Sequence, residues 1–476
     1  MTTAGGTVPA LSRTSAADLV EGYRSGSLSP VEATRAALSA IDRHDGAVNA
    51  FVLVDEDGAL AAAAASEERW RAGVPLGPGD GVPTSVKDAF WTRGWPTLRG
   101  TTLIDERGPW TEDAPVVARL REAGAVLLGK TTTPEFSWKG VTDSIRHGPT
   151  GNPWDAGLTA GGSSGGSACA VGLGMGAWSV GTDGGGSVRI PAGFTGTVGL
   201  KPTYGLVPLF PSSPFGTLAH GGPMTRTVPD AAAMLDVLAG FDARDWSAGP
   251  RPTASFVDGL DDGVGGLRIA FSPTLGYGRN DAEVEAAVRE AVRVLADAGA
   301  SVDEVDPGFA DPVDAFHALW FAGAATMLEP YGEAALDRID PGLRRAVEVG
   351  RSLSAVDYLG AVAVRVDLGR HLGVFHETYD LLVTPTLPVP AFPVDRDVPD
   401  GSASAHWTSW APYSYPFNLT QQPALSLPCG FTAAGLPIGL QVVGPRHADA
   451  LVLRAGRAYE RHTDWGRRLP TVLTAS

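Results

Sequence analysis

Residues 181–189, GTDGGGSVR, place a serine hydroxyl directly behind three consecutive glycines. Glycines allow backbones to approach closely, and a run of them presents several N–H groups that can stabilise a developing negative charge. Ser187 is therefore the predicted nucleophile of an acyl-transfer reaction. The predicted oxyanion hole consists of the N–H groups of that serine and of the glycines before it, Gly184, Gly185 and Gly186.

Such a nucleophile needs a base, and Lys87 in GVPTSVKDAF (81–90) is the predicted one. The small and apolar residues before it predict a strand that ends inside the protein. Burial disfavours the ammonium ion, so the pKa of a buried lysine falls from about 10.4 and the neutral amine can accept a proton. The alternative interpretation is a surface lysine paired with Asp88. Ser163 lies in a second glycine-rich stretch, from which its hydroxyl can pass the proton between Ser187 and Lys87.

Other motifs in the chain match known patterns but lack the required context. GAVLLGKT (124–131) fits the phosphate-binding pattern G-x-x-x-x-G-K-[ST], yet its aliphatic residues predict a buried strand and a turn. GGSSG (161–165) fits G-x-S-x-G, but the residues before it indicate a loop, whereas a nucleophile elbow follows a strand. His371 and His376 lack metal-site spacing, and no histidine is favoured as the base of a Ser-His-Asp triad. We expect no metal and no cofactor.

Composition restricts the class of protein. The 476 residues are 43% hydrophobic and 19% charged, which is typical of a globular chain. A net charge of −16 argues against nucleic-acid or anionic-membrane partners. Two cysteines, Cys169 and Cys429, indicate a reducing compartment, and neither a signal peptide nor a membrane-length apolar run is evident. We expect a cytoplasmic protein that acts on a small molecule; a homodimer is compatible with the sequence.

Alternating helix and strand patterns predict an α/β fold, with a mixed sheet and helices on its faces. We expect one catalytic domain over residues 1–476, with residues 1–75 as a helical segment packed on it. Ser29 and Glu32 form a predicted capping box, and Asp113 is a predicted helix cap. Further predicted helices cover 166–178 and 281–299, and loops are expected from Phe210 to Trp246. Predicted strands cover 84–90, 125–128, 267–273, 379–388 and 436–445.

Five segments together resemble the amidase signature family: GVPTSVKD, GAVLLGKTTTPEF, NPWDAGLTAGGSSGGSACAV, GTDGGGSVRIPAGFTGTVGLKPTYG and PFNLTQQPALSLPCGF. They occur in the family's order, and the resemblance runs from about Leu11 to about Tyr459. It implies a large central mixed sheet between layers of helices and hydrolysis of C–N bonds by a Ser–cis-Ser–Lys triad. It implies no cofactor. Within the family, the chain is similar to bacterial members that hydrolyse aryl acylamides or carbamates.

The resemblance assigns the triad residue by residue. Lys87 matches the family's lysine, Ser163 matches the bridging serine that follows a cis peptide bond, and Ser187 matches the serine that accepts the acyl group. Two positions depart from the common pattern: Gly184 stands where a side chain such as threonine is frequent, and Gln421 stands where glycine is usual. The first implies a more mobile oxyanion loop and the second a different pocket wall.

Residues around the triad also match. Asp183 and Arg189 correspond to the residues that brace the nucleophile loop, while Ser164 and Thr182 are expected to support the triad. The residues expected to bind substrate are Ser137, Trp138, Gly161 and Gly162, and further pocket candidates are Phe210, Phe215, Trp320 and Phe321.

The predicted function is that of a stand-alone serine amidohydrolase for small apolar or aryl amides, with carbamates and esters as further substrates. A glutamine-hydrolysing amidotransferase subunit is an alternative, although residues 343–361 lack the arginine-rich segment that holds glutamine there. A catalytically silent binding protein is the other alternative, and the presence of all three triad residues argues against it.

Overall fold

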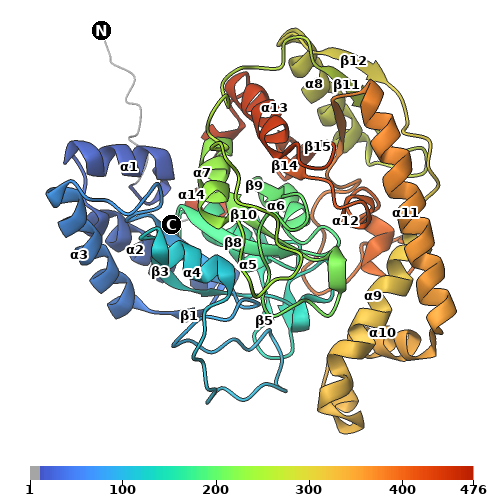
Figure 1. The fold of residues 1–476 in the computed structure, drawn as a ribbon, viewed down its shortest axis with the longest axis horizontal. Helices are drawn as coiled ribbons and strands as arrows, with labels where there is room; N and C mark the ends of the chain where they lie inside the picture. Colours follow the sequence, from blue (N-terminus) through green and yellow to red (C-terminus); the bar gives the residue numbers. More distant parts are fainter. Residues whose placement is uncertain (1–10, 475–476) are drawn as a thin grey trace.

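The computed structural model describes residues 11–474, and one eleven-stranded mixed sheet runs through them (Figure 1). From one edge to the other, its strands are β1 (Phe51–Val54), β3 (Val126–Thr131), β2 (Pro83–Lys87), β8 (Trp178–Asp183), β10 (His220–Thr225), β9 (Val198–Lys201), β14 (Ala424–Phe431), β15 (Pro437–Val443), β13 (Leu381–Pro385), β11 (Arg268–Phe271) and β12 (Ser301–Glu304).

The sheet is parallel in two regions and antiparallel between them. Strands β3, β2 and β8 are parallel to one another, as are β13, β11 and β12. The central neighbours from β8 to β13 pair in the antiparallel sense. Each of the five predicted strands is present, with its ends shifted by a few residues. The predicted mixed α/β fold is therefore confirmed.

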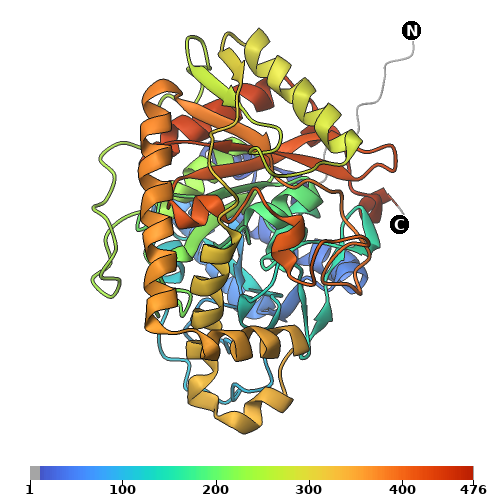
Figure 2. The ribbon, with the colours of Figure 1, turned by 90° about the vertical axis from the view of Figure 1, so that its right-hand side faces the viewer.

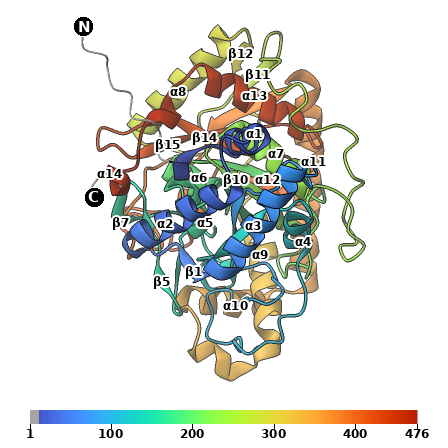
Figure 3. The same cartoon turned by 90° about the vertical axis from the view of Figure 1, so that its left-hand side faces the viewer.

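Helices cover both faces of this sheet, as the two side views show (Figures 2 and 3). Their bounds are α1 (Ala16–Ser25), α2 (Pro30–Val48), α3 (Glu56–Ala72), α4 (Pro115–Glu122), α5 (Gly165–Gly172), α6 (Arg189–Thr195), α7 (Val228–Leu238), α8 (Ala282–Asp297), α9 (Val313–Leu328), α10 (Pro341–Ser352), α11 (Ala355–Thr378), α12 (Pro416–Leu419), α13 (Asp449–Arg461) and α14 (Thr471–Thr474). Among residues 11–474, no helix has both the length and the apolar composition that crossing a membrane requires.

Strand β13 shows how the sequence divides the core between the two faces. Leu381 and Val383 belong to a hydrophobic cluster with α7, α8 and α13, whereas Leu382 between them belongs to a second cluster with α6 and α9. Successive side chains of a strand point to opposite faces, so a continuous apolar run is buried on both. The second cluster is rich in aromatic residues and lies on the side of the candidate site.

The N-terminal helices pack beside the first strands of the sheet. Ser29 and Glu32 form the predicted capping box at the start of α2, with Pro30 in the first turn. Helices α2 and α3 contact β2 and β3, and β1, which the sequence analysis did not predict, pairs with β3. The first ten residues of the predicted segment 1–75 lie outside the described residues.

Two local predictions, a helix cap and a loop, were wrong. Helix α4 has Ala114 and not Asp113 at its N-cap, because the Asp113 carboxylate instead accepts the backbone N–H of Arg93 at 2.7 Å. Phe210–Trp246 is not all loop, since it contains β10 and α7. β10 has the sequence HGGPMT, whose glycines and proline are poor strand formers. A Cβ at Gly222 would lie 2.1 Å from a carbonyl oxygen of β9, so packing selects glycine there.

The residues before GGSSG also differ from expectation. They form a short hairpin of β6 (Gly151–Asn152) and β7 (Asp155–Thr159) outside the main sheet, where a loop was predicted. The aliphatic residues of the phosphate-binding pattern lie in the buried strand β3, as predicted, but GKT continues this strand where a turn was expected. There Lys130 pairs with Asp88 at 3.3 Å, so its ammonium group already has a partner in the core.

Candidate active site

The candidate site lies where the parallel strands β2 and β8 end side by side. Because carboxyl ends of parallel strands meet at one edge, Lys87 at the end of β2 comes close to Thr182 and Asp183 at the end of β8. The turn after β8 carries Ser187 and leads into α6. Ser163 precedes α5, the helix that packs against β2 and β8.

Lys87 is fully buried among hydroxyl groups. Its Nζ lies 2.7 Å from the Ser163 Oγ, 2.8 Å from the Thr182 Oγ1 and 3.0 Å from the Ser164 Oγ. Burial lowers the pKa of Lys87 well below its usual value, and the negative charge of Asp183 opposes that shift only in part. The interpretation as a surface lysine paired with Asp88 was therefore wrong.

A neutral Lys87 carries two N–H donors and one lone pair, so one of the three neighbouring hydroxyls must donate to it. The Ser164 hydroxyl is committed elsewhere, because it donates to the Thr182 carbonyl at 3.1 Å. The hydroxyl that points at the lone pair therefore belongs to Ser163 or Thr182. This geometry brings the predicted base and the predicted bridging serine into direct contact, and the peptide bond Gly162–Ser163 is cis, as the resemblance implied.

A buried ion pair holds the turn that carries Ser187. The Arg189 guanidinium donates to both carboxylate oxygens of Asp183 at 3.0 Å, and the same carboxylate accepts the backbone N–H of Gly186 at 2.8 Å. Asn418 donates to it at 2.9 Å. Burial alone would raise the pKa of Asp183, but Arg189, Lys201 and Asn418 together bring that pKa well below its usual range.

The glycine turn presents fewer free N–H groups than expected. The N–H of Gly186 is occupied by Asp183 and is not free to stabilise an oxyanion, which corrects that part of the prediction. Within residues 11–474, no protein group accepts the N–H of Gly184, Gly185 or Ser187. The Ser187 carbonyl accepts the N–H of Ser164 at 3.1 Å, which ties the turn to the start of α5.

Gly184, where the family often carries a side chain, lies under an aromatic ring. A Cβ at this position would approach the ring of Trp320 to 2.8 Å. Trp320 in turn stacks on Phe215, with ring centroids 3.7 Å apart. The missing side chain therefore leaves space that Trp320 fills, and close packing constrains the turn that we expected to be more mobile.

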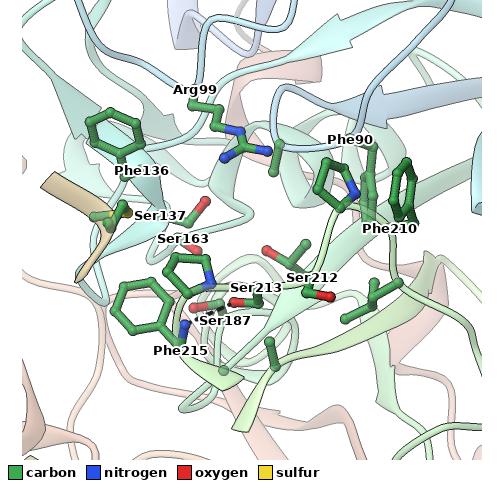
Figure 4. Close-up of a pocket in the computed structure, with 18 of the residues that line it drawn as sticks. Phe90, Arg99, Phe136, Ser137, Ser163, Ser187, Phe210, Ser212, Ser213 and Phe215 are labelled. Carbon is green, nitrogen blue, oxygen red and sulfur yellow. Dashed lines mark hydrogen bonds between the residues drawn. The ribbon is translucent and has the colours of Figure 1, made fainter. Parts of the chain in front are cut away.

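A cavity of about 720 Å³, part of it open to solvent, adjoins this turn (Figure 4). Ser163 and Ser187 lie on one side of it. Its wall is mainly aromatic and aliphatic, with several hydroxyls and one cation; it includes Phe90, Arg99, Phe136, Phe210, Phe215 and Trp320. Such a cavity suits a compact apolar ligand with a small number of polar groups.

The predicted substrate-binding residues divide into two groups. Those that line the cavity are Ser137, Phe210, Phe215 and Trp320. Those that do not are Trp138, Gly161, Gly162 and Phe321. Trp138 packs against α10 and accepts the Trp320 indole N–H at its carbonyl, so it supports the wall from behind. Gly162 is covered by the backbone of Val141, which leaves no room for a Cβ.

Sequence reasoning missed several cavity residues, namely Phe90, Arg99, Phe136, Ser212, Ser213 and Met327. Most of them lie on irregular segments, where no periodicity indicates which side chains point inward. Phe136 is the one with a usable signal, because it directly precedes Ser137. His371 and His376 play no part here, since both lie on α11 and hydrogen-bond to backbone carbonyls.

Comparison with known proteins identifies the family. A family model described as Amidase matches residues 32–453. An acylamidase from Rhodococcus erythropolis is 38% identical, over 96% of this chain and 97% of the relative. A glutamyl-tRNA(Gln) amidotransferase subunit from Myxococcus xanthus is 40% identical, over 95% of this chain and 97% of the relative.

Solved structures agree with this match. The crystal structure of a bacterial aryl acylamidase of the amidase signature family superposes with a TM-score of 0.89 at 31% identity, covering 96% of this chain and 97% of the other. The sequence match and the superposition both span almost the whole molecule. This chain is therefore a member of the amidase signature family, and with it a hydrolase that acts on C–N bonds.

Proposed function

We propose that the protein is a stand-alone serine amidohydrolase in which Ser187 is the nucleophile, Ser163 the bridging residue and Lys87 the base. The observation that carries this proposal is the buried lysine amine, surrounded by three hydroxyls at 2.7–3.0 Å. A lysine whose amine is held by hydroxyls in such a place serves as a proton acceptor better than as a structural cation.

The reaction proceeds by acyl transfer. The amine of Lys87 takes the hydroxyl proton of Ser163, which takes the proton of Ser187 as the Ser187 Oγ attacks the amide carbonyl. The tetrahedral intermediate collapses when the C–N bond breaks, and the proton returns through Ser163 to the leaving nitrogen. Water then attacks the acyl-enzyme and releases the acid, with the same relay accepting and returning the proton.

The developing oxyanion is stabilised by backbone N–H groups of the glycine turn. The donors that no group of the described chain occupies are those of Gly184, Gly185 and Ser187. Asp183 holds the turn in place through Gly186, so these donors are positioned before the substrate arrives.

The cavity favours apolar or aryl amides as substrates. Its aromatic and aliphatic walls suit a ligand that carries an aromatic ring or a short alkyl chain. The relatives named acylamidase and aryl acylamidase support this class. Aryl carbamates and esters belong to the proposal because the same acyl transfer cleaves them.

A glutamine-hydrolysing amidotransferase subunit is the second candidate, since the 40% identical relative carries that name. Free glutamine bears an ammonium group, yet none of the residues that line the cavity is acidic. A silent binding protein would have no use for the contact between Lys87 and Ser163.

Hydrolysis of an aryl amide, an aliphatic primary amide, an aryl carbamate, an ester and glutamine tests these alternatives. Ser187→Ala and Lys87→Met should each lower kcat by at least about 1,000-fold, whereas Ser301→Ala, an exposed serine on β12, should not. A fluorophosphonate should label wild type at Ser187, as read by peptide mass spectrometry. Full activity in folded Ser187→Ala would refute the mechanism. Turnover of glutamine and of no other substrate would favour the hypothesis of an amidotransferase subunit.

A further inference from the structure

One cation, Arg99, lines the cavity opposite the reacting serine. Its guanidinium points into the cavity between Phe90 and Phe136, across from Ser187 (Figure 4). The backbone is anchored, because the Arg99 carbonyl accepts the N–H of Phe136 at 2.7 Å. This hydrogen bond ties the backbone at Arg99 to the segment that carries Phe136 and Ser137.

The Arg99 guanidinium is unpaired within the part of the chain that the structure describes. Among residues 11–474, its side chain forms no hydrogen bond and no ion pair, and none of the other residues that line the cavity is acidic. Asp88 is close enough to influence it electrostatically, but that carboxylate pairs with Lys130 at 3.3 Å. Burial lowers the pKa of Arg99, yet an arginine stays protonated at neutral pH.

The Arg99 side chain is half-buried and reaches the open part of the cavity, so its guanidinium is available to pair with an anionic ligand. Its planar N–H groups match the two oxygens of a carboxylate. The surrounding walls, formed by Phe90, Phe136, Phe210 and Phe215, accommodate an apolar body between the cation and Ser187.

We propose that the preferred substrate is an amide that also bears a carboxylate, which Arg99 binds while an aromatic or alkyl body lies between the phenylalanines. The inference rests on the proposed function, because it places the scissile carbonyl at Ser187. Substrates with an additional ammonium group, such as glutamine, are disfavoured because the cavity lining has no acidic residue.

Two matched pairs of substrates test the inference and locate the carboxylate. Glutaranilate carries a carboxylate at the end of its acyl chain, where 5-methylhexananilide carries an isopropyl group. The compounds 4-acetamidobenzoate and 4-isopropylacetanilide differ in the same way on the amine side. Wild type should prefer the carboxylate member of one pair by at least about tenfold in kcat/KM.

Arg99→Met should lower that preference ratio by about 30-fold or more. Arg99→Lys, which keeps the charge but loses the planar fork, should have an intermediate ratio. Arg93→Met removes an exposed arginine from the same loop and is the matched control, with an unchanged ratio. A wild-type preference for the neutral member of both pairs, or an unchanged ratio in folded Arg99→Met, would overturn the inference.

Binding separates this inference from the proposed function. Calorimetry of Ser187→Ala with glutaranilate or 4-acetamidobenzoate needs no turnover, and Arg99→Met in that background should weaken binding of the preferred anion at least about tenfold. Arg99-dependent binding without any turnover in wild type would support the anion site and refute the proposed reaction. Turnover of neutral amides with no Arg99-dependent binding would support the reaction and refute the anion site.

Discussion

Replacing Arg189 by methionine removes the positive charge from the buried pair that braces the nucleophile turn. The guanidinium of Arg189 and the carboxylate of Asp183 are both fully buried, and the two groups share two contacts of 3.0 Å. The same side chain donates to the carbonyl of Ser414 at 2.9 Å and to the amide oxygens of Gln441 and Asn418 at 2.7 Å each. Methionine keeps much of the aliphatic stem but none of these bonds.

The expected loss of stability follows from the Asp183 carboxylate that remains buried in the variant. Removing one partner of a buried pair leaves an uncompensated charge, which costs about 3–5 kcal/mol in the free energy of unfolding. The exposed pair of Arg293 and Glu290 is the matched control, because its side chains are 73% and 63% exposed and such pairs contribute at most about 0.5 kcal/mol. The turn should also shift, and a displacement of about 1 Å lowers kcat by about 100-fold.

The dependence on pH distinguishes this mechanism from simple loss of packing. In wild type the folded-state pKa of Asp183 is depressed, so its contribution to stability is present above the unfolded pKa of about 3.9 and is lost as pH falls below it. Without Arg189, burial raises the folded pKa of Asp183 above the unfolded one. Protonation then favours the folded variant, whose stability rises as pH falls.

Urea denaturation followed by circular dichroism and tryptophan fluorescence, at pH 8 and at pH 5, measures both effects. The gap between wild type and Arg189→Met should be several kcal/mol at pH 8 and smaller at pH 5. The double variant with Asp183→Asn should lose less than the sum of the single losses. A loss no greater than that of Arg293→Met, or a gap independent of pH, would refute the reasoning.

Three further predictions concern the site. Burial lowers the pKa of Lys87, so wild-type kcat/KM should decline with unit slope as acid protonates this amine. Lys87→Arg should be inactive at every pH, because its guanidinium stays protonated. A wild-type kcat/KM that rises toward low pH in a stopped assay would contradict the role of Lys87 as the base. Gly184→Ala should destabilise by about 1–3 kcal/mol in thermal denaturation, because the new Cβ meets Trp320 at 2.8 Å, and Trp320→Leu should relieve part of this interaction. Trp138→Phe removes a buried indole N–H that has no partner among the described residues. It should therefore lower the free energy of unfolding by less than about 1 kcal/mol and leave KM unchanged. A severalfold rise in KM would place Trp138 in the cavity.

The sequence alone indicated those features whose signals are local. The helix 281–299 was predictable because its apolar residues recur at helical spacing, and all four, Val284, Val288, Val292 and Leu295, are buried in α8. Lys87 was predictable as a buried lysine at a strand end because the residues before it are small and apolar. The order and spacing of the motifs predicted the family, and with it the contact between Lys87 and Ser163.

Tertiary structure decided the features that depend on segments far apart in the chain. β10 exists because β8 and β9 accept a glycine-rich strand between them, against its local propensity. Trp320 fills the space above Gly184, although the two residues lie far apart in the sequence. Trp138 is next to Ser137 in the sequence but faces away from the cavity. Arg99 points into the cavity from a loop with no periodicity. Residue types and short-range spacing encode which chemistry is present, but the direction of a side chain on an irregular segment is set by long-range packing, which no local pattern records.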